Sequence, residues 1–175
     1  MTCFGIESGA QAVLDANEKG TKVAQNTQAL KVARENGFKT VGFLVAGLAG
    51  ETVETARQTL DWLAEVRPTM DYCNLAVGIP YPGSKFWTHP DESGIEILDY
   101  NYGNQWIVGF SARDEILVRP YGCTVDEMFK VKELMFKGLC DLGLAKAEWD
   151  EDVRIKRASP PSSDLAVGAL SYAGH

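Results

Sequence analysis

The sequence predicts an α/β fold built from parallel βα units, and three observations indicate it. Short apolar segments of strand-like composition occur at residues 2–7, 40–46 and 70–79, with helix-like segments between them. Each connection is long enough for a βαβ crossover, which is right-handed in nearly all parallel sheets. A turn containing glycine or proline follows each strand segment. Periodicity leaves open whether such a sheet stays open or closes into a barrel.

Two helices are predicted between the first two strands. Residues 10–18 are good helix formers, and Gly20 marks their end. A second helix is expected over 21–36, with Thr21 as its cap and Gly37 just beyond its end. Its apolar stripe follows the helical period: Val23, Thr27, Leu30 and Ala33.

The second strand, 40–46, is almost continuously apolar, which is typical of a strand buried on both faces of a parallel sheet. A helix is expected over 51–66, where Glu51 at its start interacts favourably with the helix dipole. The third strand, 70–79, ends at a sharp break over 80–84.

Past residue 88 the pattern changes. Residues 95–110 are rich in aromatic side chains and predict extended segments or a hairpin around Gly103. A helix is predicted over 124–142, where Thr124 and Glu127 form a capping box. The tail, rich in Ser, Pro, Gly and Ala, is predicted to be disordered. The predicted division of the chain is a first unit 1–88, an extension 89–157 and a tail 158–175.

Composition indicates an ordinary globular domain. The chain has 175 residues, 45% of them hydrophobic, and a formal net charge of −7. Its lysines and arginines are scattered, so we expect no nucleic-acid or membrane partner. The apolar runs are too short to span a bilayer and no signal peptide is visible, so a cytoplasmic setting is expected. No metal site is expected from the cysteines, which lack ligand spacing: Cys3, Cys73, Cys123 and Cys140.

The turns that follow the three strands form the candidate site. Ligands of parallel α/β folds bind at the carboxyl ends of strands, so these turns should line one rim. Glu7 and Ser8 could bind ribose hydroxyls or an amine; alternatively, Ser8 caps a turn and Glu7 faces water. Gly47 and Gly50 would bring the backbone, with free N–H groups at the next helix start, close to a ligand. An ordinary βα turn, and a stiff turn without a ligand at 80–84, remain the alternatives.

The order and spacing of these turns resemble radical S-adenosylmethionine (SAM) proteins. Residues 5–9 (Gly-Ile-Glu-Ser-Gly) and 19–21 (Lys-Gly-Thr) resemble the fourth-strand region of that family. Residues 47–52 (Gly-Leu-Ala-Gly-Glu-Thr) resemble its fifth-strand turn, with alanine in place of the usual proline, and 80–84 (Pro-Tyr-Pro-Gly-Ser) the segment after its sixth strand. The likeness covers about residues 2–88 and is closest to the branch with methylthiotransferases and cobalamin-binding members.

The resemblance implies half of a TIM-like (β/α)6 partial barrel followed by a C-terminal α+β extension. Members of the family hold a [4Fe–4S] cluster that cleaves SAM to a 5′-deoxyadenosyl radical, and a cobalamin cofactor is left open. The resemblance assigns Glu7 and Ser8 to the ribose, Gly47, Leu48 and Ala49 to the adenine, and Val77 and Gly78 to the adenine pocket wall.

The departures from the family pattern limit the expected activity. The chain has no Cys-x-x-x-Cys-x-x-Cys loop, and the first three strands of a barrel would have to precede Thr2. We therefore expect a truncated barrel that binds no cluster alone, binds SAM weakly or not at all, and needs a missing N-terminal half-barrel or partner chain. The alternatives are a non-catalytic half-barrel subunit, completed by a partner or a second copy at its open edges, and an unrelated TIM-barrel fragment.

Overall fold

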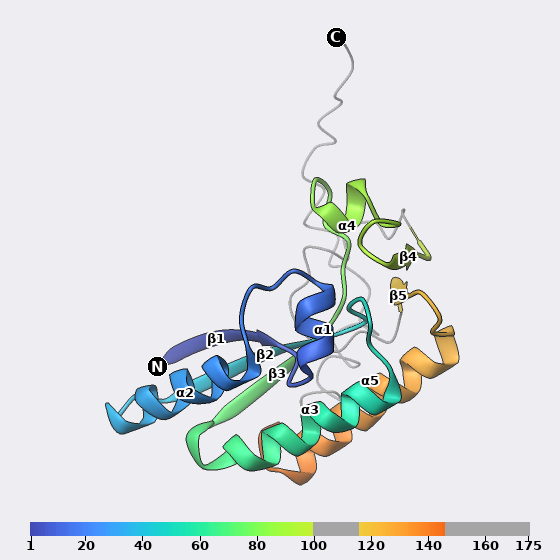
Figure 1. Ribbon diagram of the computed structural model, residues 1–175. Helices are drawn as coiled ribbons and strands as arrows, with labels where there is room; N and C mark the ends of the chain where they lie inside the picture. The colour runs from blue at the N-terminus through green and yellow to red at the C-terminus, as the bar shows by residue number, and fades with distance from the viewer. Residues whose placement is uncertain (100–115, 146–175) are drawn as a thin grey trace, which may run out of the picture.

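The structure, a computed structural model, describes residues 1–99 and 116–145 of the chain. Its centre is a three-stranded parallel sheet with helices on one face (Figure 1). In chain order the elements are β1 (Thr2–Glu7), α1 (Gln11–Ala16), α2 (Val23–Glu35), β2 (Thr40–Ala46), α3 (Val53–Val66), η1 (Arg67–Thr69), β3 (Tyr72–Val77), α4 (Lys85–Thr88), β4 (Ile95–Ile97), β5 (Val118–Pro120) and α5 (Val125–Asp141). The predicted α/β class with parallel βα units is confirmed, as an open sheet with a small antiparallel pair beside it.

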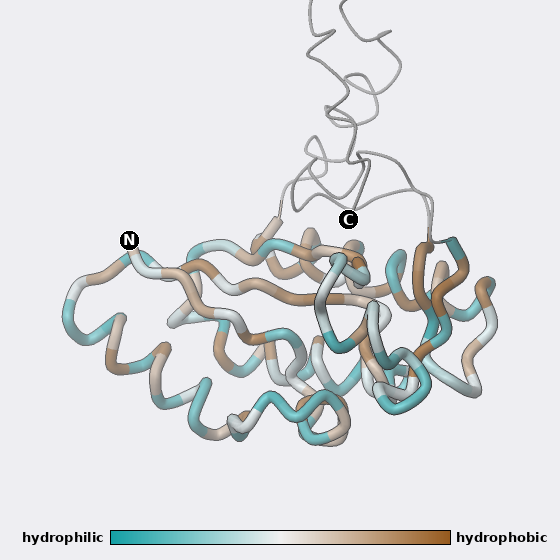
Figure 2. Tube along the Cα trace, turned by 90° about the horizontal axis from the view of Figure 1, so that it is seen from above, coloured by the Kyte–Doolittle hydropathy of each residue, from teal (hydrophilic) through white to brown (hydrophobic). Residues whose placement is uncertain are grey.

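The sheet has the order β1-β2-β3, so the almost continuously apolar strand lies in the centre. Burial alternates along β2: Leu44 and Ala46 are buried towards the helices, whereas Phe43 and Val45 are half-buried on the opposite face. The expectation that β2 is buried on both faces is therefore wrong within the described residues, because the helices cover one face. Figure 2 shows the hydrophobic colour running along the strands.

One hydrophobic core joins the sheet to the helices beneath it in Figure 1. Leu30 of α2, Leu63 of α3 and Met128 of α5 are each completely buried in it. Helices α3 and α5 lie side by side, so the predicted extension packs on the same core as the first three strands. The boundary near residue 88 remains a prediction, and residues 158–175 lie outside the described part.

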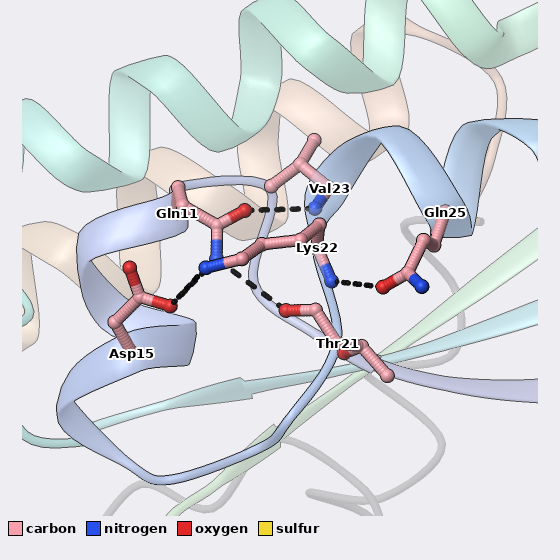
Figure 3. Close-up of polar contacts among 6 residues, drawn as sticks. All are labelled: Gln11, Asp15, Thr21, Lys22, Val23 and Gln25. Carbon is pink, nitrogen blue, oxygen red and sulfur yellow. Dashed lines mark hydrogen bonds and ion pairs between the residues drawn. The ribbon is translucent and has the colours of Figure 1, made fainter.

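The start of α2 differs from the prediction that Thr21 caps it. The N-cap is Lys22, whose backbone N–H donates to Gln25 Oε1 at 2.7 Å. The N–H of Val23 donates to Gln11 Oε1 at 2.9 Å, so a side chain from α1 satisfies the first turn of α2 (Figure 3). Capping by a residue twelve positions earlier has no local sequence signature.

The second half of the described chain contains the predicted helix, and an extended segment, β4, lies at the start of the aromatic-rich stretch. Thr124 and Glu127 form the predicted capping box of α5: the N–H of Thr124 donates to Glu127 Oε2 at 2.8 Å, and the N–H of Glu127 donates to Thr124 Oγ1 at 3.2 Å. β4 pairs antiparallel with β5, a strand that the sequence did not predict. The expected turn at Gly103 lies outside the described residues.

The outer edges of the sheet are covered unequally. On β3, the N–H of Cys73 donates to the carbonyl of Leu144, so the segment after α5 takes up part of that edge. On β1, β2 is the one strand partner within the described part of the chain. None of the helices in 1–99 and 116–145 combines the length and hydrophobicity that a membrane span requires.

Candidate functional site

The carboxyl ends of β1, β2 and β3 open onto one pocket of about 460 Å³. Its wall is mostly apolar, and Glu7 and Tyr81 supply its polar side chains. The lining residues are Gly5, Glu7, Phe43, Leu44, Val45, Leu48, Ala76, Val77, Gly78, Ile79, Tyr81 and Phe86. A concave apolar site with few polar groups at the ends of parallel strands is where such folds bind small molecules.

Glu7 ends β1 in a backbone conformation that residues with side chains seldom adopt. Its φ is +64°, and the register of β1 against β2 shifts between Gly5 and Glu7. The Glu7 side chain lies so close over Gly5 that a Cβ there would be 2.9 Å from Glu7 Oε1. Lys19 Nζ donates to that oxygen at 2.7 Å, and the two side chains are 26% and 31% exposed. Backbone strain of this kind is concentrated at binding and active sites.

Ser8, the neighbour of Glu7, lies behind the pocket. It is 1% exposed, and its hydroxyl forms a 3.0 Å hydrogen bond with the hydroxyl of Thr59 on α3. The N–H of Ala10 also donates to Ser8 Oγ, at 3.1 Å. Ser8 therefore fixes the turn after β1 to α3, as the alternative interpretation expected, and it does not line the pocket.

The turn after β2 presents one side chain to the pocket. Leu48 lines the wall, whereas Gly47 and Ala49 do not. The N–H of Gly47 donates to Glu51 Oε2 at 2.5 Å. The side-chain amide of Asn17 binds both backbone groups of Ala49: its Oδ1 accepts from the N–H at 3.1 Å, and its Nδ2 donates to the carbonyl at 3.0 Å. At the helix start, where free N–H groups were expected, the N–H of Thr52 donates to Thr55 Oγ1 and the N–H of Thr55 to Thr52 Oγ1, so that expectation is wrong for these two groups.

The end of β3 completes the wall. Val77 and Gly78 both line the pocket, and the N–H of Gly78 donates to the carbonyl of Ala46 at 2.7 Å. A Cβ on Gly78 would lie 2.8 Å from a methyl of Val118 on β5. Glycine at this position therefore lets β5 approach the end of the sheet.

Of the seven residues predicted from the sequence, the structure brings four together at the pocket. Glu7, Leu48, Val77 and Gly78 line it, whereas Ser8, Gly47 and Ala49 lie in the adjoining turns outside its lining. What each would contact in a bound ligand remains a prediction.

Glu51 is the residue whose position the sequence reasoning missed. It is 1% exposed, and burial raises the pKa of its carboxyl from 4.5 to about 7, against the opposing effect of hydrogen bonds from the N–H groups of Gly47 and Leu48. Thr52 is the N-cap of α3, which places Glu51 before the helix rather than in its first turn. The pair Thr52 and Thr55 was the sequence signal for that shift.

The four cysteines are spread across the described part of the chain. Cys3 is exposed, Cys73 and Cys123 are buried, and Cys140 is half-buried. Burial raises the pKa of the Cys73 thiol to about 12, so it stays protonated. Within residues 1–99 and 116–145, no three His, Cys, Asp or Glu side chains are grouped so that they could hold a metal ion.

Comparisons with known proteins relate the chain to part of the radical SAM enzymes. It is 31% identical over 101 residues to the anaerobic magnesium-protoporphyrin IX monomethyl ester cyclase of Rubrivivax gelatinosus, covering 58% of this chain and 18% of that protein. It is 30% identical over 86 residues to an uncharacterized methyltransferase of Pyrococcus horikoshii, covering 49% of this chain and 18% of that protein. A putative methylthiotransferase of Methanocaldococcus jannaschii is 30% identical over 89 residues, covering 44% of this chain and 20% of that protein.

The likeness is to a fragment of these proteins. The chain spans about a fifth of the length of the curated relatives it matches. Among solved structures, it aligns with an N-terminally shortened Elp3 of Methanocaldococcus infernus at a TM-score of 0.43 and 14% identity, over 82% of this chain and 36% of that one. No family model matches the chain. The sequence similarities to the curated relatives confirm the expected resemblance as partial similarity to radical SAM enzymes.

Proposed function

We propose that this chain supplies the adenosyl-binding side of a radical SAM enzyme and is catalytically incomplete alone. The observation that carries the proposal is the pocket that unites three turns, distant in sequence, at the carboxyl ends of β1, β2 and β3. The partial similarity to radical SAM enzymes supports the choice of ligand. In a complete enzyme, SAM on a reduced [4Fe–4S] cluster supplies a 5′-deoxyadenosyl radical.

The residues present fit an adenosyl group. Val45, Leu48 and Ala76 offer aliphatic surface on which a planar base can lie, and Phe43 adds an aromatic ring. Glu7 places a carboxylate at the edge of this surface, where it can accept hydrogen bonds from ribose hydroxyls. This chain's share of the chemistry is to bind and orient the nucleoside and to keep water from it.

Filling the pocket tests this proposal. Ala76 lines the pocket on the face of β3 opposite the helices, so Ala76→Leu adds bulk there without entering the core. We expect wild-type chain to bind S-adenosylhomocysteine weakly, with amide shift changes at Glu7, Leu48 and Gly78 in an NMR titration. Ala76→Leu should weaken that binding by about tenfold or more, because the added side chain displaces ligand atoms.

Val41→Leu is the matched control, because Val41 lies on the same sheet face but outside the pocket wall. Equal binding by wild type and Ala76→Leu, or an equal loss in Val41→Leu, would place the ligand elsewhere. Cobalamin binding is not part of the proposal, since no described contact favours it.

A second candidate is a half-barrel subunit completed by a partner chain or a second copy, and an apolar groove favours it. The groove, about 690 Å³, runs between β1 and α2. Val32 and Phe38 line it and are 45% and 51% exposed. Beside it lies the edge of β1 that no described strand covers. A strand with a following helix would both extend the sheet and cover the groove.

Introducing a charged side chain into the groove should abolish association through it. We expect Val32→Glu to lower the sedimentation-equilibrium mass of concentrated chain towards that of a monomer, because a charge cannot be buried unpaired. Val125→Glu, at an exposed valine on α5, is the control and should change nothing. Wild-type chain that remains monomeric at every concentration would remove self-association and leave a different partner chain.

A further inference from the structure

We propose that Glu51 is a positioning residue of the pocket: its carboxylate fixes the turn from which Leu48 enters the pocket wall. The statement about the turn stands on the contacts of Glu51 alone. Its consequence for an adenosyl ligand rests on the proposed function.

Glu51 binds the turn with both its side chain and its backbone. Its Oε2 accepts from the N–H of Gly47 at 2.5 Å, and the N–H of Leu48 also donates to the carboxylate. The backbone N–H of Glu51 donates to the carbonyl of Leu48 at 3.1 Å. Gly47 has a φ of +93°, a backbone conformation that glycine adopts readily and other residues seldom adopt. The hydrogen bonds with Glu51 hold the turn in this conformation.

The helix that follows has no need of this side chain. Thr52 caps α3 by accepting from the N–H of Thr55 at 3.2 Å, and Thr55 Oγ1 accepts from the N–H of Thr52 at 2.8 Å. Helix α3 therefore begins with its own capping contacts. The buried carboxylate acts on the turn before the helix.

Burial of the Glu51 carboxylate lowers the free energy of unfolding. Its second oxygen, Oε1, is buried without a hydrogen-bond partner among the described residues. A buried carboxylate with one unused oxygen opposes folding, whereas an apolar side chain of similar size would not. The other oxygen, Oε2, accepts the hydrogen bond from Gly47 in the pocket turn.

Protonation of Glu51 should weaken its hydrogen bonds to the N–H groups of Gly47 and Leu48, because a neutral carboxyl accepts hydrogen bonds less strongly than a carboxylate. Burial raises the pKa of Glu51 towards neutrality, so this change falls within the physiological range. The facing titratable group is the thiol of Cys123, before α5, whose pKa is raised by burial and then by Glu127 and Glu51. Arg119 of β5 acts on that thiol in the opposite direction.

Residue-resolved amide hydrogen exchange of the full chain tests the proposal. We expect Glu51→Ala to speed exchange at Gly47 and Leu48 by about tenfold relative to Leu44 in the centre of β2, since each of the two amides loses its hydrogen bond to the carboxylate. Glu51→Gln keeps an acceptor oxygen and should show a smaller change. Glu54→Gln removes a charge from the exposed first turn of α3 and is the control.

A second readout is the amide proton shift of Gly47 in the wild type. It should move in one step near neutral pH, and the step should vanish in Glu51→Gln; this measurement holds even if Glu51→Ala fails to fold. No such step, unchanged exchange at Gly47, or equal acceleration at Gly47 and Leu44 would each overturn the proposal. Absence of S-adenosylhomocysteine binding would instead contradict the proposed function, because neither readout uses a ligand.

Discussion

Raising the pH from 4.5 to 8 is expected to lower the stability of the wild-type chain, relative to Glu51→Gln, by about 3 kcal/mol. The pKa of Glu51 is raised by burial from 4.5 to about 7 in the folded chain. Between those values the folded chain binds a proton that the unfolded chain has released, so stability falls as the pH rises. A difference of about 2.5 pKa units corresponds to about 3 kcal/mol. Urea unfolding of both proteins across this range measures the effect.

Glu54→Gln serves as the matched control for this series. Glu54 lies three residues further along the chain and is largely exposed, with a side-chain distance of 3.9 Å to Arg57. Its removal should leave the pH dependence of stability within about 0.5 kcal/mol of wild type. A constant difference between wild type and Glu51→Gln from pH 4.5 to 8 would show that Glu51 ionises as an ordinary exposed carboxyl.

Reconstitution with iron and sulfide is expected to leave the isolated chain without a stoichiometric [4Fe–4S] cluster. A cluster is held by converging thiolates. Cys3 and Cys73 project from opposite faces of the sheet, and Cys73 is buried towards the helices. Cys123 and Cys140 lie before and near the end of α5, roughly 25 Å apart along the helix. Iron and sulfide analysis, together with the visible absorbance of the desalted chain, measures the outcome.

Cys3→Ser is the matched control, since Cys3 is the exposed cysteine among the four. Iron bound adventitiously by that thiol should disappear in Cys3→Ser, with no effect on the fold. A full complement of iron and sulfide in the wild type, lost on substitution of any of the four cysteines, would refute the claim that the chain is incomplete alone.

Local sequence signals predicted the backbone of the site well. The β-branched run of β2 and the glycines after it identified a strand and a turn, because both features act within a few residues. The capping box of α5 is equally local, and the structure confirms it. Three turns could therefore be assigned to one rim from the parallel topology alone.

What the sequence did not reveal depends on contacts between distant residues. Ser8 lies behind the pocket because Thr59, 51 positions later, binds its hydroxyl. The N–H of Val23 at the start of α2 is bound by Gln11, and the N–H of Ala49 by Asn17, the residue at the C-terminal end of α1. Burial of Glu51 likewise follows from packing around the turn, which no short motif encodes. β4 pairs with β5, which lies some twenty positions later in the sequence, roughly four times the length of the longest common hairpin loop, so no hairpin signal predicts the pairing.

The central claim is that the pocket at the ends of β1, β2 and β3 receives an adenosyl group. Intermolecular nuclear Overhauser effects between S-adenosylhomocysteine and the methyl groups of the full chain test it most directly. We predict contacts from the adenine protons to the methyls of Val45, Leu48 and Ala76, all in the pocket wall. Contacts confined to Ala29 and Val32 in the groove beside α2, or none at saturating ligand, would contradict it.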